Sequence, residues 1–203
     1  MPPRTSSPPR EIRIIGGKWK RTRLPVADKP GLRPTPDRVR ETLFNWLGQQ
    51  LDGWHCIDAF AGTGALGLEA ASRGAAQVLL VEQDADLVAV LRKIQARLGA
   101  AHVRVQRGNG LSVLGSLAPG SMDLVLLDPP FGAGLFEKAL RAAQPALKPG
   151  GFLYLEAPME WAEASLAPFG LARLRHLRAG AVHAHLLQLH NAVQQSAGPP
   201  DAG

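Results

Sequence analysis

The segment LDPPF, residues 127–131, closes an apolar run that predicts a buried strand. Asp128 and the Pro129 carbonyl both accept hydrogen bonds, and the prolines stiffen the loop because proline fixes φ and lacks an N–H donor. Phe131 offers a face on which a planar ring could stack. We therefore predict that Asp128, Pro129, Pro130 and Phe131 form a catalytic loop that binds a heterocycle carrying an exocyclic amine. The alternative is a tight turn that only closes a core strand.

The chemistry expected at this loop is group transfer to that amine. Its lone pair is delocalised into the ring, so hydrogen bonds from its N–H groups to Asp128 and the Pro129 carbonyl would hold the nitrogen toward sp3 geometry. Catalysis would then come from positioning and electrostatics rather than from a strong base. A base in a nucleic acid must leave its stack to reach such a pocket, which predicts a flipped or looped-out nucleotide.

A second motif, DAFAGTGALG at residues 58–67, follows an apolar strand and opens a helix, the context that the GxGxxG pattern requires. Gly62 and Gly64 allow a tight turn, and the helix N-terminus behind them favours an anionic group. Glu82 lies 20 residues after Gly62 and could accept hydrogen bonds from both hydroxyls of a ribose. The motif therefore predicts a nucleoside-containing cofactor.

Asp58 favours S-adenosylmethionine over a dinucleotide, because a carboxylate there would repel a pyrophosphate but could orient an amino group. The alternative is that Asp58 only caps the glycine turn. Asn109, after the third expected strand, could contact the adenine edge or simply cap the next helix.

The elements that must position these residues alternate between strand and helix. Strands are predicted at 55–60, 77–82, 103–107, 122–128 and 151–156, and helices at about 64–74, 85–98, 110–117 and 135–147. This pattern indicates a parallel sheet covered on both faces, with the fourth strand beside the first. Residues 171–190 predict a closing antiparallel pair joined at Ala179-Gly180.

The N-terminal quarter carries all of the excess positive charge. Residues 1–50 hold 11 Lys+Arg against 4 Asp+Glu, whereas residues 51–203 hold 12 against 13. Residues 11–24 predict a β-hairpin around Gly16-Gly17, and a helix is predicted from Pro36 and Asp37. A concentrated basic segment is typical of a polyanion binder, and the alternative is a solvated basic tail.

Composition sets the remaining expectations. The single cysteine, Cys56, excludes an internal disulfide and fits a cytoplasmic protein, and no signal peptide or membrane span is apparent. We predict a disordered tail (1–10), a basic hairpin and helix (11–50), a methyltransferase domain (51–193) and a second disordered tail (194–203). A monomer is the default expectation. His183, His185 and His190 are interpreted as strand residues, and no metal is expected because no cysteine or helical ligand spacing accompanies them.

Three blocks resemble the bacterial 16S rRNA guanine-N2 methyltransferase family across residues 13–189. They are RIIGGKWKRTRL (13–24), RPTPDRVRETLFNWL (33–47), and DAFAGTGALGLEAASRGA (58–75) together with LDPPF. The resemblance implies an α/β, Rossmann-like S-adenosylmethionine-dependent methyltransferase fold. Its sheet would be seven-stranded and mostly parallel, with a C-terminal antiparallel pair and a small basic N-terminal extension. The implied substrate is a guanine of 16S rRNA, in a partly or fully assembled small subunit.

The resemblance also implies roles for individual residues. The cofactor-binding residues would be Thr35, Arg38, Asp58, Phe60, Gly62, Thr63, Gly64, Glu82, Gln83, Asn109 and Asp128. The RNA-binding residues would be Arg13, Lys18, Trp19, Lys20, Arg21 and Arg23. Two of these assignments have alternatives: Arg38 could be a surface cation, and Trp19 could be the hydrophobic anchor of the hairpin.

Three rival functions remain open at this point. An adenine-N6 DNA methyltransferase shares the DPPF loop but would usually carry a DNA-reading domain. A nicotinamide oxidoreductase would need neither DPPF nor a polarised basic arm. A nucleic-acid binding module would keep the cofactor fold without activity.

Overall fold

The computed structural model describes residues 11–29 and 32–190. The disorder predicted for residues 1–10 and 194–203 concerns residues outside these ranges. Within them, no helix is long and apolar enough to cross a membrane.

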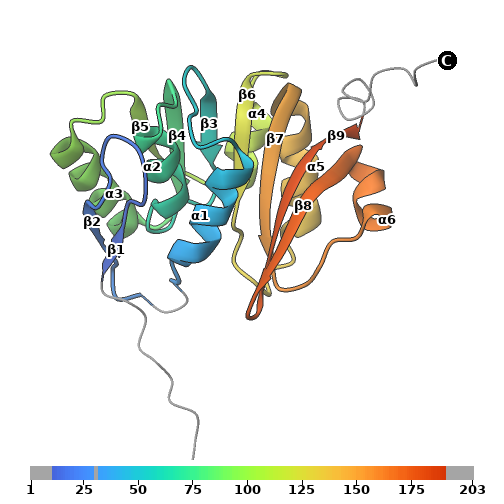
Figure 1. The fold of residues 1–203 in the computed structure, drawn as a ribbon, viewed down its shortest axis with the longest axis horizontal. Helices are drawn as coiled ribbons and strands as arrows, with labels where there is room; N and C mark the ends of the chain where they lie inside the picture. The colour runs from blue at the N-terminus through green and yellow to red at the C-terminus, as the bar shows by residue number, and fades with distance from the viewer. Residues whose placement is uncertain (1–10, 30–31, 191–203) are drawn as a thin grey trace, which may run out of the picture.

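One seven-stranded sheet forms the centre of the molecule, in the order β5-β4-β3-β6-β7-β9-β8 (Figure 1). The pairs from β5 to β7 are parallel, and β9 is antiparallel to both β7 and β8. The predicted fold class is thus confirmed, including the position of the fourth strand beside the first. The strands are β3 (His55–Asp58), β4 (Gln77–Glu82), β5 (Val103–Arg107), β6 (Met122–Leu127), β7 (Leu147–Ala157), β8 (Leu171–Ala179) and β9 (Val182–Leu189).

Helices cover both faces of this sheet and create two apolar cores. Buried residues of α1, α2 and α3 form one core, and those of α4, α5 and α6 form the other. The helices are α1 (Asp37–Trp46), α2 (Ala65–Ser72), α3 (Ala85–Leu98), α4 (Gly110–Ser116), α5 (Phe136–Ala143) and α6 (Glu163–Leu166), with 3-10 turns η1 (Gln144–Ala146) and η2 (Ala167–Phe169).

Most element boundaries agree with the predicted ranges, and the exceptions have local causes. The helix predicted to reach residue 147 ends at Ala143, because Pro145 has no N–H to continue the helical ladder and a 3-10 turn follows. β7 begins at Leu147 rather than at 151, and its pairing with β6 shifts register in that first part. The short α6 and η2 were not predicted.

The basic N-terminal segment forms the expected hairpin, but with a long connection. β1 (Glu11–Arg13) pairs antiparallel with β2 (Arg23–Pro25), and residues 14–22 join them. Gly17 opens a turn in this connection, in which the Lys20 N–H donates to the Gly17 carbonyl at 3.2 Å. The backbone of Gly16 and Gly17 also packs against the end of α2, where a Cβ at Gly17 would overlap the Ser72 carbonyl. The glycines are therefore needed for close packing of the hairpin.

A buried carboxylate holds the hairpin, α1 and α2 together. Glu69 Oε2 accepts hydrogen bonds from the Ile15 N–H at 2.8 Å and from Arg40 Nη1 at 3.3 Å. Its Oε1 accepts from the Gly16 N–H at 2.8 Å and from Arg73 Nε at 2.9 Å. Glu69 and Arg40 are fully buried, so the charges are compensated by one another rather than by water.

Replacing Glu69 with glutamine should strongly destabilise the protein, because Arg40 and Arg73 would lose their buried counter-charge. We expect Glu69→Gln to lower the free energy of unfolding by about 3–5 kcal/mol, measured by urea denaturation. Glu41→Gln, an exposed change in α1, is the matched control and should stay within about 0.5 kcal/mol of the wild type. Equal stability of the two variants would contradict the role given to Glu69.

Candidate active site

Three carboxylates lie at the same edge of the sheet, on neighbouring strands. Asp58 ends β3, Asp128 directly follows β6, and Glu156 lies near the end of β7. Register places Asp58 opposite Leu126, and Leu127 opposite Leu155, so Asp128 is level with Glu156. Because side chains alternate between faces, all three acids point to the face covered by α1 and α2. In an open parallel sheet this carboxyl edge is where ligands bind.

Asp58 has one oxygen in use and one free. Its Oδ2 accepts a hydrogen bond from the Gly67 N–H at 3.0 Å, whereas Oδ1 is buried without a partner among the residues described. Burial raises the pKa of Asp58 to about 7, opposed by the Gly67 N–H. An unpaired buried carboxylate oxygen is costly in the free protein and fits a ligand ammonium group. This fits the methionine end of S-adenosylmethionine.

The glycine loop and Glu82 form the adjacent part of the site. Gly62 and Gly64 have φ values of +51° and +78°, in the left-handed region that favours glycine. Glu82 Oε2 accepts from the Gly62 N–H at 2.9 Å, and Oε1 accepts from the Asp84 N–H at 2.8 Å. The loop and the start of α3 therefore fix Glu82, and each of its oxygens keeps a lone pair for a hydroxyl donor. Thr63 is buried in the same loop, its Oγ1 accepting from the Ala65 N–H at 3.3 Å.

Asn109, Gln83 and Phe60, the other residues predicted at the nucleoside end, lie around the ends of β4 and β5 and the start of α4. Asn109 caps α4, with Oδ1 accepting from the Ser112 N–H at 3.2 Å, which is the second of the two roles considered for it. Gln83 is exposed after β4, and Phe60 is half-buried against the start of α4. Their contacts with a cofactor stay predictions.

The start of α1 brings Thr35 and Arg40, rather than Arg38, into the interior. Thr35 is buried and its side chain hydrogen-bonds Glu156. Arg38 is exposed on α1, as the surface-cation alternative requires, and its contact with a cofactor carboxylate stays a prediction. Arg40 was missed in the sequence, although it follows Val39 at the edge of the apolar stripe, a position unusual for a cation.

Glu156 was also missed, and a sequence signal was available. It is 3% exposed, and Tyr154 Oη donates a hydrogen bond to its Oε1 at 2.9 Å. An acid at the end of an apolar strand is the pattern shared by Asp58, Glu82 and Asp128. The run FLYLEA repeats it at the fifth expected strand.

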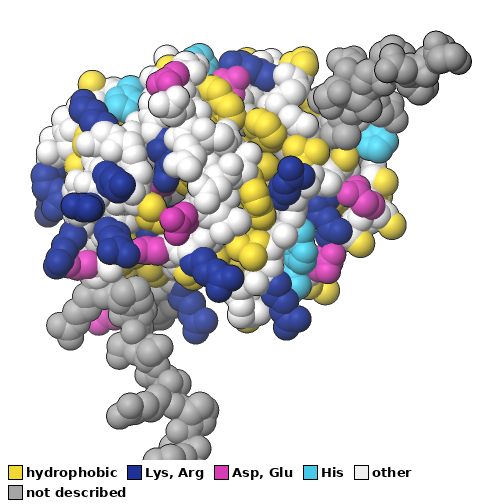
Figure 2. All heavy atoms as spheres, viewed as in Figure 1, with side chains coloured by type: hydrophobic (Ala, Val, Ile, Leu, Met, Phe, Trp, Pro, Cys, Tyr) yellow, Lys and Arg dark blue, Asp and Glu magenta, His cyan; other side chains and the backbone are white. Residues whose placement is uncertain are grey.

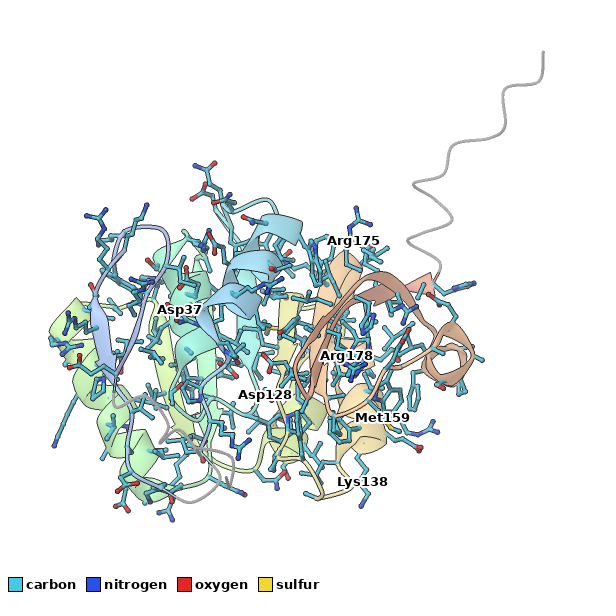
Figure 3. The ribbon with its side chains drawn as sticks, turned by 60° about the horizontal axis from the view of Figure 1, so that its bottom comes forward. Asp37, Asp128, Lys138, Met159, Arg175 and Arg178 are labelled. Carbon is cyan, nitrogen blue, oxygen red and sulfur yellow. The ribbon has the colours of Figure 1, made fainter. Side chains whose placement is uncertain are left out.

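The DPPF loop presents its aromatic ring outward. Asp128 is partly exposed, Pro129 is buried, and Phe131 is 44% exposed. The Phe131 ring lies 6.1 Å from that of Phe136. Figure 3 shows Asp128 at this edge of the sheet, with Lys138, Met159 and Arg178 on its β7–β9 side. Met159 is 63% exposed, so two large apolar side chains are exposed in this region.

The basic hairpin separates its cations from its tryptophan. Figure 2 shows Lys and Arg side chains gathered over β1, β2 and α3. Trp19 is instead buried and stacks on His102, with ring centroids 5.6 Å apart. The tryptophan is therefore the hydrophobic anchor of the hairpin, and its buried ring corrects the expectation that it stacks on RNA. The exposed cations are Arg13, Lys18, Lys20, Arg21 and Arg23; Arg13 pairs with Asp37, and Arg23 with Glu11.

Three histidines meet on β8 and β9, although His190 is not among them. The ring nitrogens of His176, His183 and His185 lie within 4.8 Å of one another. Their rings are nearly parallel, at 17–25°, so their lone pairs do not converge on one point. His185 also accepts from the Trp161 N–H at 3.0 Å, and burial lowers its pKa to about 4. The cluster has the geometry of stacked rings rather than of a metal centre.

The sheet order, the glycine loop and the strand-end acids together define the Rossmann-like methyltransferase fold. The chain is 45% identical over 152 residues to ribosomal RNA small subunit methyltransferase D of Escherichia coli (strain K12), covering 74% of this chain and 76% of that protein. The Haemophilus influenzae protein of the same name is 41% identical over 151 residues, covering 72% and 78%. A solved structure from Escherichia coli, yhhF, assigned to the methyltransferases, superposes with a TM-score of 0.77 at 41% identity, covering 88% and 98%.

Residues 12–188 match the family model described as conserved hypothetical protein 95, and the chain belongs to this family. The resemblance to small-subunit rRNA methyltransferases expected from the three sequence blocks is thereby confirmed.

The raised pKa of Asp58 predicts a pH-dependent stability of the free protein. The folded state keeps this proton up to about pH 7, whereas the unfolded chain, with the ordinary value of 3.8, releases it earlier. The free energy of unfolding should therefore fall as pH rises from about 4 to about 7, and by less in Asp58→Asn. Urea denaturation across this pH range measures the free energy of unfolding of the wild type and of Asp58→Asn. Asp28→Asn, an exposed change, is the control, and a fall of wild-type size in Asp58→Asn would contradict the assignment.

Proposed function

We propose that this protein transfers a methyl group from S-adenosylmethionine to the exocyclic N2 amine of a guanine in 16S rRNA. The observation that carries the proposal is the position of the Asp128 loop. It lies on the strand next to Asp58, at the same edge of the sheet as the glycine loop. The proposed cofactor site and the proposed amine-accepting site would therefore be neighbours. The names of the Escherichia coli and Haemophilus influenzae relatives support rRNA as the substrate.

The residues that would hold the cofactor come from three parts of the edge. Asp58 Oδ1 would accept from its ammonium group, the loop from Gly62 to Gly64 would approach it closely, and Glu82 would accept from the ribose hydroxyls. Bound S-adenosylmethionine would supply a methyl group carried on a positively charged sulfur.

The DPPF loop would bind and orient the guanine. The Asp128 carboxylate and the Pro129 carbonyl would accept hydrogen bonds from the two N–H groups of the amine, which directs the lone pair away from the ring plane. Phe131, exposed beside them, would stack on the flipped base. The residues would thus act by orientation and hydrogen bonding, the kind of contribution that a stiff, proline-containing loop can make.

The reaction is tested with labelled S-adenosylmethionine and three substrates: unmodified small subunits, naked 16S rRNA and duplex DNA. We expect label in rRNA as N2-methylguanine, identified by nuclease digestion and mapping. The more reactive RNA form would distinguish assembled subunits from free rRNA. Label in DNA would support the adenine-N6 alternative, and cofactor binding without transfer to any substrate would support a binding module.

Asp128→Ala provides the mechanistic test in the same assay. We expect transfer to fall by about 100-fold or more while S-adenosylmethionine still binds, because the amine loses its acceptor. Glu137→Gln, an exposed change in α5, should behave as the wild type. Unchanged turnover in Asp128→Ala would exclude this loop as the target pocket.

The exposed cations of the hairpin should contribute phosphate contacts. Lys18→Ala with Lys20→Ala is expected to raise the Kd for 16S rRNA roughly tenfold and to reduce the dependence of log Kd on log salt by about 1 to 2. Filter binding over a salt series measures this. The control pair, Arg141→Ala with Arg175→Ala, removes the same charge from exposed positions on α5 and β8, away from the hairpin. If both pairs changed the Kd equally, the hairpin would contribute only net charge to RNA binding and no specific phosphate contacts.

A further inference from the structure

Glu156 and Asp128 are neighbours on adjacent strands, with Glu156 buried and Asp128 partly exposed. Register makes them level across β6 and β7, and both point to the face that carries α1. Glu156 is 3% exposed, and Asp58, on the other side of Asp128, is 1% exposed. Three carboxyl groups thus lie on neighbouring strands at one edge of the sheet, two of them buried, so their like charges oppose one another.

The neighbouring side chains stabilise the ionised form of Glu156 more than that of Asp128. Tyr154 on β7 donates a hydrogen bond to Glu156, and the Thr35 side chain, before α1, also lowers the pKa of Glu156. Arg40 on α1 is the cation acting on Glu156, although its guanidinium already binds Asp37 and Glu69.

The charged neighbours of Asp128 are carboxylates, which oppose its ionisation. Glu156 and Asp58 act on it, and Glu82 on β4 lies beyond Asp58. Among the residues described, no donor hydrogen-bonds Asp128.

A proton is therefore held unequally between the two acids. Burial, and then the charges of Glu156 and Asp58, raise the pKa of Asp128 well above its ordinary value. Burial also raises the pKa of Glu156, but its hydrogen bonds to Thr35 and Tyr154 and the charge of Arg40 oppose that rise. Glu156 has the Tyr154 hydroxyl as a donor at 2.9 Å and Asp128 has no donor among the residues described, so the ionised form is better supported on Glu156 than on Asp128.

We propose that Glu156 is a positioning residue that keeps Asp128 protonated in the free protein, and that Asp128 releases this proton when a cationic ligand fills the neighbouring cofactor pocket. The O–H bond of Asp128 breaks, the proton passes to solvent, and the carboxylate remains. The inference rests on the proposed function, because that function supplies a positively charged cofactor and an amine that must be accepted.

This arrangement would make the amine acceptor available only when the cofactor is present. A protonated Asp128 presents an O–H donor that opposes the amine N–H, whereas the carboxylate accepts from it. A cation beside the three acids favours the ionised form. S-adenosylhomocysteine lacks the sulfonium charge, so the same site should release fewer protons when it binds that product.

Isothermal titration calorimetry of the full-length protein tests this without RNA. Titrating S-adenosylmethionine and S-adenosylhomocysteine at pH 7 in phosphate and in Tris gives the number of protons released by each ligand. In the wild type we expect S-adenosylmethionine to release up to about one proton more than S-adenosylhomocysteine. Glu156→Gln should reduce this difference to less than about half, because removal of the neighbouring charge leaves Asp128 already ionised.

Two further variants separate positioning from folding. Glu156→Asp keeps the charge and should restore the difference at least in part. Asp128→Asn removes the proposed proton site and should reduce the difference at least as far as Glu156→Gln does, with any remainder coming from Asp58. Glu160→Gln, at an exposed carboxylate a few residues after Glu156, is the control. Urea denaturation establishes that each variant is folded. In the methyl-transfer assay, the acidic limb of the kcat profile should move to lower pH in Glu156→Gln.

The outcomes distinguish this inference from the proposed function. A wild type that shows no difference between the two ligands, or a folded Glu156→Gln that keeps the full difference, would overturn the role of Glu156 while leaving methyl transfer to rRNA intact. Glu156-dependent proton release without transfer to any RNA would instead support the inference and overturn the substrate. A chain that binds neither ligand would overturn both.

Discussion

The buried carboxylate of Glu69 joins parts of the chain that are far apart in sequence. It accepts hydrogen bonds from two backbone N–H groups of the hairpin connection and from the guanidinium groups of Arg40 and Arg73. A charge removed from water is stable only while its partners are present, so the hairpin, α1 and α2 hold one another in place. The position of Thr35 beside Glu156 at the carboxyl edge depends on this network.

The direction of the strands imposes the second constraint. Parallel neighbours end at the same edge, and four of them carry an acid there: Asp58, Glu82, Asp128 and Glu156. Each is compensated to a different degree. Glu82 accepts from two backbone N–H groups, and Glu156 accepts from the Tyr154 hydroxyl. Asp58 uses one oxygen, and Asp128 has no donor among the described residues. Asp58 and Asp128, which lack partners in the free protein, lie where a ligand would supply them. The free protein is less stable for this reason, and ligand binding recovers the lost interactions.

Aromatic residues show why residue type alone does not give a role. Trp19 and Phe131 both lie in polar loops beside expected binding surfaces, and both could stack on a base. Trp19 is buried and its ring stacks on His102, whereas Phe131 stays exposed beside Asp128. The partner that buries Trp19 is 83 positions away, so no local pattern could reveal it. The histidines of β8 and β9 become neighbours in the same way, through strand pairing.

Local sequence determined the elements and the shape of the cofactor loop. The spacing of apolar residues and the helix caps set the limits of β4, β5 and α3. Glycine stands at positions 62 and 64 because the turn requires positive φ there. Tertiary structure decided which charges are buried. Arg40 rather than Arg38 enters the core, and Glu156 joins Asp128, because burial and charge pairing depend on strands and helices that meet across more than 20 residues. The energy of a buried charge depends on its contacts with segments that are distant in sequence. The sequence shows which residue types could make such contacts but not which of them meet.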